Sequence, residues 1–392
     1  MSVSSSPEPS GAGAPPSGAA VSAPVYYVAQ PAAPPTLLGR LWQWFMRTFF
    51  VMSLLLNVFL WSMVVSLSGS VDTLLEKHVS GDRQARDKIA IIKVDGVIME
   101  GFIHYVTQQI KAAAKDHDVR GVILAINSPG GSVTASDLLH KQIVDLRNGK
   151  WPGQEKPKPV VVSMESIAAS GGYYIAAPAQ KIVAQPTTIT GSIGVYAQLF
   201  NVAGLAEKYG VEFKLIKKGE LKGSGSPFKK MTPEEEREFA ELMESSYQRF
   251  MRIVKEGRDG QPEGARLKYE LRDEIQVETL TEPKTTYVRR LADGGAFTAD
   301  EALNYGLIDQ IGYQEDAIRL LQSLLGEPSS QFKVVSYVKP FSWGDALFGM
   351  KDETPPMGMT LEQIPGATRR MWYLTSGYEL AGLNLAAFQS KK

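Results

Sequence analysis

A serine with unusually small neighbours stands in the stretch SMESIAASGGYYIAAPA, residues 163 to 179. Ser170 follows two alanines and precedes two glycines, and the flanks are apolar. Small neighbours serve either the close packing of two backbone segments or the approach of a substrate to the hydroxyl. A strand before Ser170 and a helix after it would place the Gly171 N–H beside the hydroxyl. That arrangement resembles a nucleophile elbow, although the G-x-S-x-G pattern itself is not matched.

A second glycine turn, INSPGGSV at residues 126 to 133, follows another apolar run. A Pro-Gly-Gly turn after a buried strand presents backbone N–H groups at the start of the next helix. Such groups can stabilise a negative oxygen, which makes Gly130 and Gly131 candidate oxyanion-hole residues. The same turn could simply need the positive φ that glycine adopts. The residues alone leave both interpretations open.

A serine nucleophile needs a base, and the chain has few histidines to supply one. The four are His78, His104, His117 and His140, and none lies in a partner motif. A lysine can act as the base where burial or nearby charge lowers its pKa. Lys222 in KKGELKGSGSPFKKMT is the best local candidate, because glycines and serines around it would let the chain bring it close to another segment.

Composition excludes several other classes of protein. The 392 residues carry 42 basic and 42 acidic side chains, so no net positive field favours nucleic acid. There is no cysteine, which excludes disulfides and thiolate metal sites. The histidines are not clustered, so we expect neither a metal site nor another cofactor.

The N-terminal part predicts a membrane anchor behind a disordered tail. Residues 1–36 are rich in Pro, Ala, Ser and Gly and cannot bury enough apolar surface to fold. Residues 45–68 are predicted to form a transmembrane helix, and the uncharged part of this run is about as long as a bilayer core requires. A cleaved signal peptide is the alternative, with Ser66-Leu67-Ser68 as a loose cleavage site.

The charges that flank this segment predict its orientation. Arg40 and Arg47 lie on its N-terminal side, whereas Asp72 and Glu76 follow it. The positive-inside rule then leaves the N-terminus in the cytoplasm and the rest of the chain on the outer, periplasmic or extracellular, face. The polar residues 69–86 are predicted to form a stalk.

Apolar runs and helical patterns alternate from residue 87 to about residue 335. Strands are expected at 88–94, 121–127, 158–164, 181–186 and 211–219. Continuous apolar strands separated by helices indicate an α/β fold with parallel βαβ units. The long helix that starts near Thr232 carries a capping box with Glu235, and its apolar stripe is expected to pack on the domain. Residues 336–392 are expected to be a partly irregular extension.

Four motifs in this order resemble the signal peptide peptidase A family: INSPGGSV, ASGGYYIA, TITGSIGV and ELKGSGSPFKKMT. The resemblance covers roughly residues 88 to 340 and includes the later GGAFTADEALNYGLID. The family consists of membrane-bound serine proteases of the Clp protease/crotonase superfamily. Membership would imply a repeated ββα spiral, a Ser–Lys dyad and a single-repeat form of the enzyme.

The resemblance assigns roles to particular residues. It implies that Ser170 is the nucleophile, Lys222 the general base and Ser192 the residue that orients the lysine. Gly171 with Gly131 or Gly130 would form the oxyanion hole. Family members often carry an acidic residue after the lysine, whereas Gly223 stands here, which puts the surroundings of the lysine in doubt.

The same resemblance implies the substrates and the assembly. Substrates would be signal peptide remnants or other membrane-associated peptides, and the chain would form a ring-like homo-oligomer, a tetramer or an octamer. Three alternatives remain: a crotonase-like acyl-CoA enzyme using Glu165, an inactive membrane scaffold, and a protease fed by an ATPase. Binding of CoA would identify the first, and failure to react with a serine-directed probe would favour the second.

Overall fold

The computed structural model describes residues 36–68, 74–260, 266–279, 281–326, 332–339 and 372–374. The predicted N-terminal tail and most of the predicted extension 336–392 lie outside these residues. The chain divides into two units, Met1–Val65 and Ser66–Lys392.

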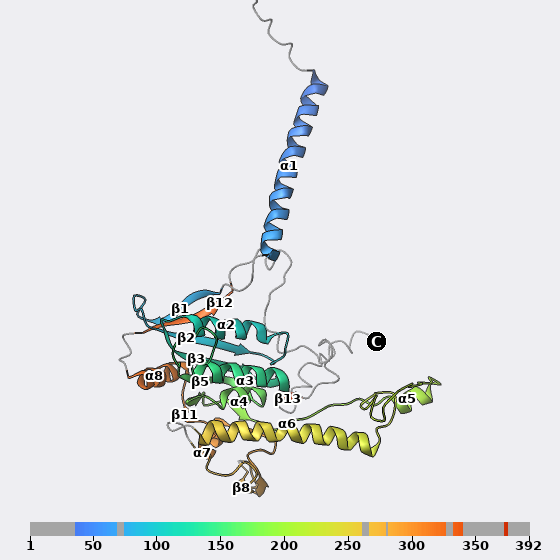
Figure 1. Ribbon diagram of the computed structural model, residues 1–392, viewed down its shortest axis with the longest axis vertical. Helices are drawn as coiled ribbons and strands as arrows, with labels where there is room; N and C mark the ends of the chain where they lie inside the picture. The colour runs from blue at the N-terminus through green and yellow to red at the C-terminus, as the bar shows by residue number, and fades with distance from the viewer. Residues whose placement is uncertain are drawn as a thin grey trace, which may run out of the picture. The chain divides into compact units, whose positions relative to one another are not determined.

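The N-terminal unit contains one long apolar helix, α1 (Leu37–Ser68) (Figure 1). Its segment Leu37–Ser62 is long and apolar enough to cross a membrane. The helix begins before the predicted residue 45 because the preceding residues are also apolar or aromatic. The polar side chain of Asn57 is satisfied inside the helix, since its Nδ2 donates to the Ser53 carbonyl at 2.8 Å. A polar residue bonded within its own helix is compatible with lipid.

The second unit is built on one mixed sheet with the strand order β1-β12-β2-β3-β5-β6-β11. From β12 to β11 all neighbours are parallel, and β1 pairs with β12 antiparallel. The strands are β1 (Leu75–Gly81), β2 (Lys88–Asp95), β3 (Val119–Ser128), β5 (Val160–Ala169), β6 (Lys181–Ala184), β11 (Gln310–Ile311) and β12 (Lys333–Val338). This arrangement confirms the expected α/β class and the four predicted strands between residues 88 and 186.

Helices cover both faces of this sheet (Figure 1). One face carries α2 (Ile103–Lys115), α3 (Val133–Arg147) and α4 (Gly171–Ala176) over the larger apolar core. The other face carries α8 (Gln314–Leu325), whose Leu321 packs with Ile91 and Ile123. Because both faces are covered, the central strands are apolar throughout, as the sequence predicts.

Shorter elements extend this framework. They are β4 (Gly130–Ser132), β7 (Ile189–Gly191), α5 (Ala203–Lys208), α6 (Pro233–Asp259), the hairpin β8 (Ile275–Glu278) and β9 (Thr286–Arg289), β10 (Ala296–Thr298), α7 (Ala299–Tyr305) and β13 (Trp372–Leu374). Strand β7 pairs with β5 in parallel and with β10 antiparallel, so it prolongs the sheet beyond the end of β5.

Two sequence-based expectations are wrong. The stalk predicted over 69–86 contains β1, an edge strand whose side chains are almost all exposed. Its place depends on backbone hydrogen bonds to β12, which leave no apolar pattern in the sequence. Residues 211–219, predicted as a strand, form no regular element, because their apolar side chains stay exposed and none of the described strands pairs with them.

The long helix α6 begins as the sequence predicts but packs over only part of its length. The capping box between Thr232 and Glu235 is present. Its C-terminal half buries Phe250 and Val254, whereas Leu242 in the N-terminal half is 49% exposed. Figure 1 shows this N-terminal half and α5 projecting beyond the helices that cover the sheet. The predicted apolar stripe therefore packs on the domain in its C-terminal part and leaves apolar surface uncovered in its N-terminal part.

A buried ion pair links the C-terminal end of α6 to the sheet. Arg258 is fully buried, and its Nη2 donates to Oδ2 of Asp309 at 2.8 Å. The same carboxylate accepts the backbone N–H of Ile182 on β6 at 2.8 Å. Removing one partner of such a pair leaves the other charge buried without compensation.

We expect Arg258→Met to lower the free energy of unfolding by about 3 kcal/mol, because the buried Asp309 carboxylate then keeps only the more distant Lys181 Nζ, at 3.9 Å, as a cationic partner. Urea unfolding followed by circular dichroism would measure this. Arg272→Met, which removes an exposed pair with Glu244, is the matched control and should change stability by less than about 1 kcal/mol. Equal effects of the two substitutions would contradict the role given to the buried pair.

A partly buried histidine, His140, lies on α3. The His140 ring meets the Tyr174 ring edge-on, with centroids 5.4 Å apart. Burial lowers the pKa of His140 to about 4; Asp137 opposes this shift, and the positive charges of Arg249 and Arg147 add to it. The folded protein therefore holds this histidine neutral at pH values where an exposed histidine is charged.

This histidine makes stability depend on pH. Between the unfolded pKa of about 6.5 and the folded pKa of about 4, the unfolded chain binds the proton and the folded chain does not. Stability should therefore fall as the pH drops through this window, by at most roughly 3 kcal/mol. Unfolding midpoints at pH 7, 6 and 5 would measure the loss, and His140→Phe should flatten the profile. An unchanged profile in that variant would contradict the assignment.

Candidate active site

Ser170 lies where β5 ends and α4 begins, in a strained backbone conformation. Its φ is 53° and its ψ is −113°. Among the described non-glycine residues only Ser170 and Ser192 have positive φ, and both are residues singled out from the sequence. A serine held in such a strand-to-helix turn is the geometry of a nucleophile elbow. Strain of this kind costs about 1–3 kcal/mol and is concentrated at functional sites.

The two glycine turns predicted from the sequence meet beside this serine. A Cβ placed on Gly171 would lie 3.1 Å from both the Cα of Gly130 and the backbone nitrogen of Gly131. A Cβ on Gly172 would lie 2.7 Å from the Ser128 carbonyl oxygen. The glycines are therefore required because backbone approaches backbone, and the structure brings the predicted oxyanion-hole residues together at Ser170.

The turn that contains Gly130 and Gly131 is fixed by hydrogen bonds. The Ile98 N–H donates to the Gly130 carbonyl at 2.9 Å, and the Ile98 carbonyl accepts from the Ser132 N–H at 2.8 Å. The Gly130 N–H donates to the Ser128 hydroxyl at 3.2 Å. The Gly130 amide already has this acceptor inside the turn, whereas Gly131 lies opposite Tyr373 of β13, so Gly131 is the better candidate for an oxyanion donor where a substrate replaces β13.

The Ser170 hydroxyl is fully buried and has no hydrogen-bond partner among the described residues. Its backbone N–H donates to the Gly191 carbonyl at 2.7 Å, which ties the serine to the end of β7. Buried hydroxyls are normally bonded, so an unpaired one at a strained turn indicates a functional group.

Ser192 follows Gly191 in the chain, but its own hydrogen bonds go to residues after α6 rather than to Ser170. Its hydroxyl donates to the Gly294 carbonyl at 2.9 Å, and its N–H donates to the Gly295 carbonyl at 3.0 Å. It borders a cavity of about 730 Å³ between α6 and residues 292–295, with Tyr196 and Tyr247 also in the lining.

Lys222 is not a partner of Ser170 within one chain. It is exposed and lies in the segment between β7 and α6, where it borders a separate cavity of about 800 Å³ together with Leu199 and Phe239. The structure thus assembles four predicted groups, namely Ser170, Gly171, the Gly130–Gly131 turn and Ser192, and leaves the predicted base outside.

A strand that the sequence did not predict lies beside the glycine turn. Strand β13 pairs antiparallel with β4, so that Trp372, Tyr373 and Leu374 lie opposite Ser132, Gly131 and Gly130. The sequence around β13 is rich in Pro, Gly and Met and gives no alternating pattern. The edge of β4 next to Ser170 is thus able to pair with an extended chain.

Glu165, the residue on which the acyl-CoA alternative depends, lies on β5. Burial raises the pKa of its carboxyl, and the charge of Asp95 adds to this shift. Within the described part of the chain no group of three or more acidic, histidine or cysteine side chains could hold a metal ion.

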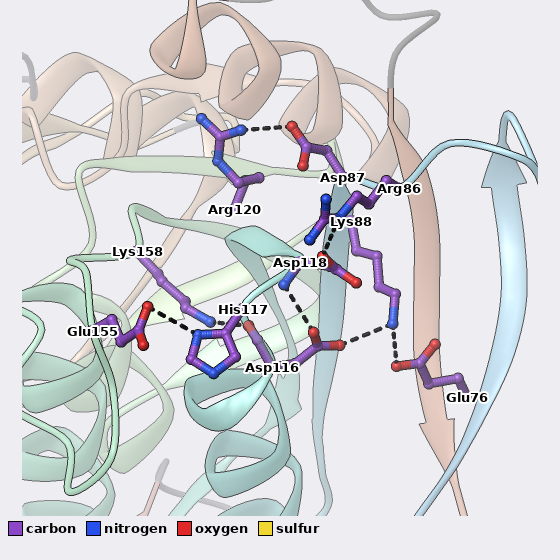
Figure 2. Close-up of polar contacts among 10 residues, drawn as sticks. All are labelled: Glu76, Arg86, Asp87, Lys88, Asp116, His117, Asp118, Arg120, Glu155 and Lys158. Atoms are coloured by element: carbon purple, nitrogen blue, oxygen red, sulfur yellow. Dashed lines mark hydrogen bonds and ion pairs between the residues drawn. The ribbon is translucent and has the colours of Figure 1, made fainter.

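A third cavity lies at the opposite edge of the sheet, where β2, β3 and β5 begin (Figure 2). Its volume is about 430 Å³. Figure 2 shows its charged side chains joined in pairs: Arg86 with Asp118 at 2.9 Å, His117 with Glu155 at 3.1 Å, and Arg120 with Asp87 at 2.5 Å. Lys158 donates to the carbonyls of Ala113 and Asp116. Charges that neutralise one another in this way do not select a ligand, so this pocket is the weaker candidate site.

The fold and the site define a class. A parallel α/β sheet presents a strained serine beside a glycine turn, as serine hydrolases do. A model of peptidase family S49 matches residues 153–265, a segment that contains Ser170, Ser192 and Lys222.

Three relatives have similar sequences. A candidate protease of Methanocaldococcus jannaschii is 36% identical over 210 residues, which are 54% of this chain and 58% of the relative. A candidate signal peptide peptidase SppA of Enterococcus faecium is 36% identical over 214 residues, 55% of this chain and 54% of the relative. A candidate protease of Synechocystis is 35% identical over 241 residues, 62% of this chain and 76% of the relative.

The chain belongs to peptidase family S49, the signal peptide peptidase A family. This confirms the resemblance found in the sequence motifs. The matches span little more than half the length of the first two relatives.

The strain at Ser170 predicts an unusual order of stabilities. Glycine adopts positive φ freely whereas alanine does not, so the free energy of unfolding of Ser170→Gly, measured by denaturant unfolding, should exceed that of Ser170→Ala by about 1 kcal/mol. Both variants lack the hydroxyl, so the comparison isolates the backbone. Ser163, buried in the regular part of β5, is the control, and there the glycine variant should be the less stable one. The same order at both positions would show that Ser170 carries no strain.

Proposed function

We propose that the chain is a membrane-anchored serine endopeptidase that uses Ser170 as its nucleophile. The observation that carries this proposal is the unpaired, fully buried hydroxyl of Ser170 at a strained turn, against the glycines of a second turn. The Clp protease/crotonase-like spiral expected from the sequence is part of the same proposal, as is the serine-protease chemistry of the family.

The mechanism follows from the positions of these groups. The Ser170 oxygen attacks a peptide carbonyl while its proton passes to the base, and the carbonyl electron pair moves to the oxygen. The N–H groups of Gly171 and Gly131 would hold that oxyanion. Collapse breaks the C–N bond, the base returns the proton to the leaving amine, and water then hydrolyses the acyl-enzyme.

We assign the base to Lys222 of a neighbouring copy in a homo-oligomer. Within one chain Lys222 is exposed, while Ser170 is buried without a partner. The segment that carries Lys222 also exposes large apolar side chains, such as Phe200 at 63% and Ile216 at 88%, which is typical of an interface. The cavity beside Ser192 would receive the neighbour, and Ser192 would then orient the lysine. A ring of four or eight copies fits this proposal.

The substrates are extended peptides close to a membrane. The edge of β4 next to Ser170 pairs with an extended strand, β13, which is how proteases and many peptide-binding domains hold a chain. With α1 as the anchor and the N-terminus in the cytoplasm, the catalytic unit would lie on the outer face. Remnants of signal peptides would reach it there.

A serine-reactive fluorophosphonate probe tests the proposal on the full-length protein in detergent. Wild type should be labelled, Ser170→Ala should not, and Lys222→Ala should react about 10²–10⁴-fold more slowly because the general base is lost. Lys218→Ala, an exposed lysine of the same segment, is the matched control and should react normally. An unlabelled wild type would favour the inactive scaffold, and binding of CoA would favour the acyl-CoA enzyme.

Mixing inactive chains tests the shared site. When Ser170→Ala and Lys222→Ala chains are dissociated, combined in equal amounts and reassembled, sites formed between copies would regain both groups in about a quarter of cases. Peptidase activity near that fraction of wild type is therefore expected. Absence of any rescue, with reassembly verified by size-exclusion chromatography, would place the dyad within one chain.

A further inference from the structure

A second serine beside Ser170 is also buried and unpaired. Ser136 lies on α3, one turn after the N-cap Ser132, and is 0% exposed. Its hydroxyl has no hydrogen-bond partner among the described residues, as is also true of Ser170.

The Ser136 hydroxyl is directed at the oxyanion-hole residues. A Cβ built on Gly171 would lie 2.5 Å from the Ser136 Oγ and 3.1 Å from the Gly131 nitrogen. The hydroxyl and the Gly131 amide therefore converge on the same point beside Gly171. The Ser136 hydroxyl, together with the backbone of Gly130 and Gly131, leaves no room for a side chain at Gly171.

A structural role does not explain a serine at this position. Ser132, in the same helix turn, is engaged twice: its hydroxyl accepts from the Ala135 N–H at 3.4 Å and donates to Glu100 at 2.7 Å. A serine inside a helix usually bonds to the carbonyl four residues earlier, but Ser136 does not. Alanine would suit the helix better and would bury no unpaired hydroxyl.

We propose that the Ser136 hydroxyl is a third hydrogen-bond donor to the oxyanion, beside the N–H groups of Gly171 and Gly131. This inference rests on the proposed function, since it needs an oxyanion formed by attack of Ser170. The hydroxyl keeps its proton throughout the reaction. It is unpaired in the free protein and is satisfied only when the carbonyl oxygen becomes negative, so it stabilises the transition state rather than the bound substrate.

Ser136→Ala in the full-length protein tests this. We expect kcat/KM for a peptide substrate to fall roughly 10–100-fold through kcat, with KM little changed. A peptide aldehyde, which forms a tetrahedral adduct with the nucleophile, should bind more weakly by a similar factor. The unfolding midpoint should stay the same or rise, because an unpaired hydroxyl is removed. Cysteine has a similar volume but is a weaker hydrogen-bond donor, so Ser136→Cys should have kcat/KM and aldehyde affinity between those of wild type and Ser136→Ala.

The controls separate failure of this inference from failure of the proposed function. Ser163→Ala removes another buried serine hydroxyl and should leave kcat and aldehyde affinity unchanged. If wild type reacts, Ser170→Ala does not, and Ser136→Ala is as active as wild type, the role of Ser136 is refuted while the protease stands. Loss of activity together with a lowered unfolding midpoint, in both Ser136 variants, would show a packing role instead. A wild type without activity would overturn both proposals.

Discussion

The closeness of three backbone segments around Ser170 is the constraint on which the site depends. The end of β3, the turn into β4 and the first residues of α4 approach one another so closely that Gly171 and Gly172 have no room for a Cβ. This contact brings the backbone of one turn next to the strained serine of another. The parallel sheet makes the contact possible, because β3 and β5 are neighbours and both turns leave from their carboxyl ends.

The two edges of the sheet are organised differently. At the edge where β2, β3 and β5 begin, charged side chains are joined in ion pairs, as with Lys88 between Glu76 and Asp116. At the other edge the buried hydroxyls of Ser136 and Ser170 have no hydrogen-bond partners in the part of the chain that the structure describes. Satisfied charges stabilise a structure, whereas unsatisfied hydroxyls are costly unless a reacting group uses them. By this criterion the edge with fewer charged residues is the better candidate for the active site.

Much of this could be predicted from the sequence, for identifiable reasons. The central strands are buried on both faces, so their continuous apolar runs were recognisable, and the small residues around Ser170 revealed a close approach. Lys222 could not be placed, because its position relative to Ser170 depends on contacts beyond its own segment. Strands β1 and β13 were missed because backbone pairing alone defines them, and backbone pairing leaves little trace in side-chain types. Ser136 has no signal of its own beyond a serine in a helix.

The pairing of β13 with β4 has a consequence for how a peptide would bind. The free edge of β4 (Gly130–Ser132) is already paired with β13 of the protein's own chain. An incoming peptide would therefore have to displace β13 and replace its backbone hydrogen bonds, rather than fill an open groove. The backbone hydrogen bonds lost with β13 and gained with the peptide would be similar, so the binding free energy would depend mainly on the side chains of the peptide. Because β13 belongs to the same molecule, its local concentration is fixed and does not fall on dilution. Peptides that bind weakly would thus be excluded, because β13 is covalently attached to the protein and always competes with them for β4.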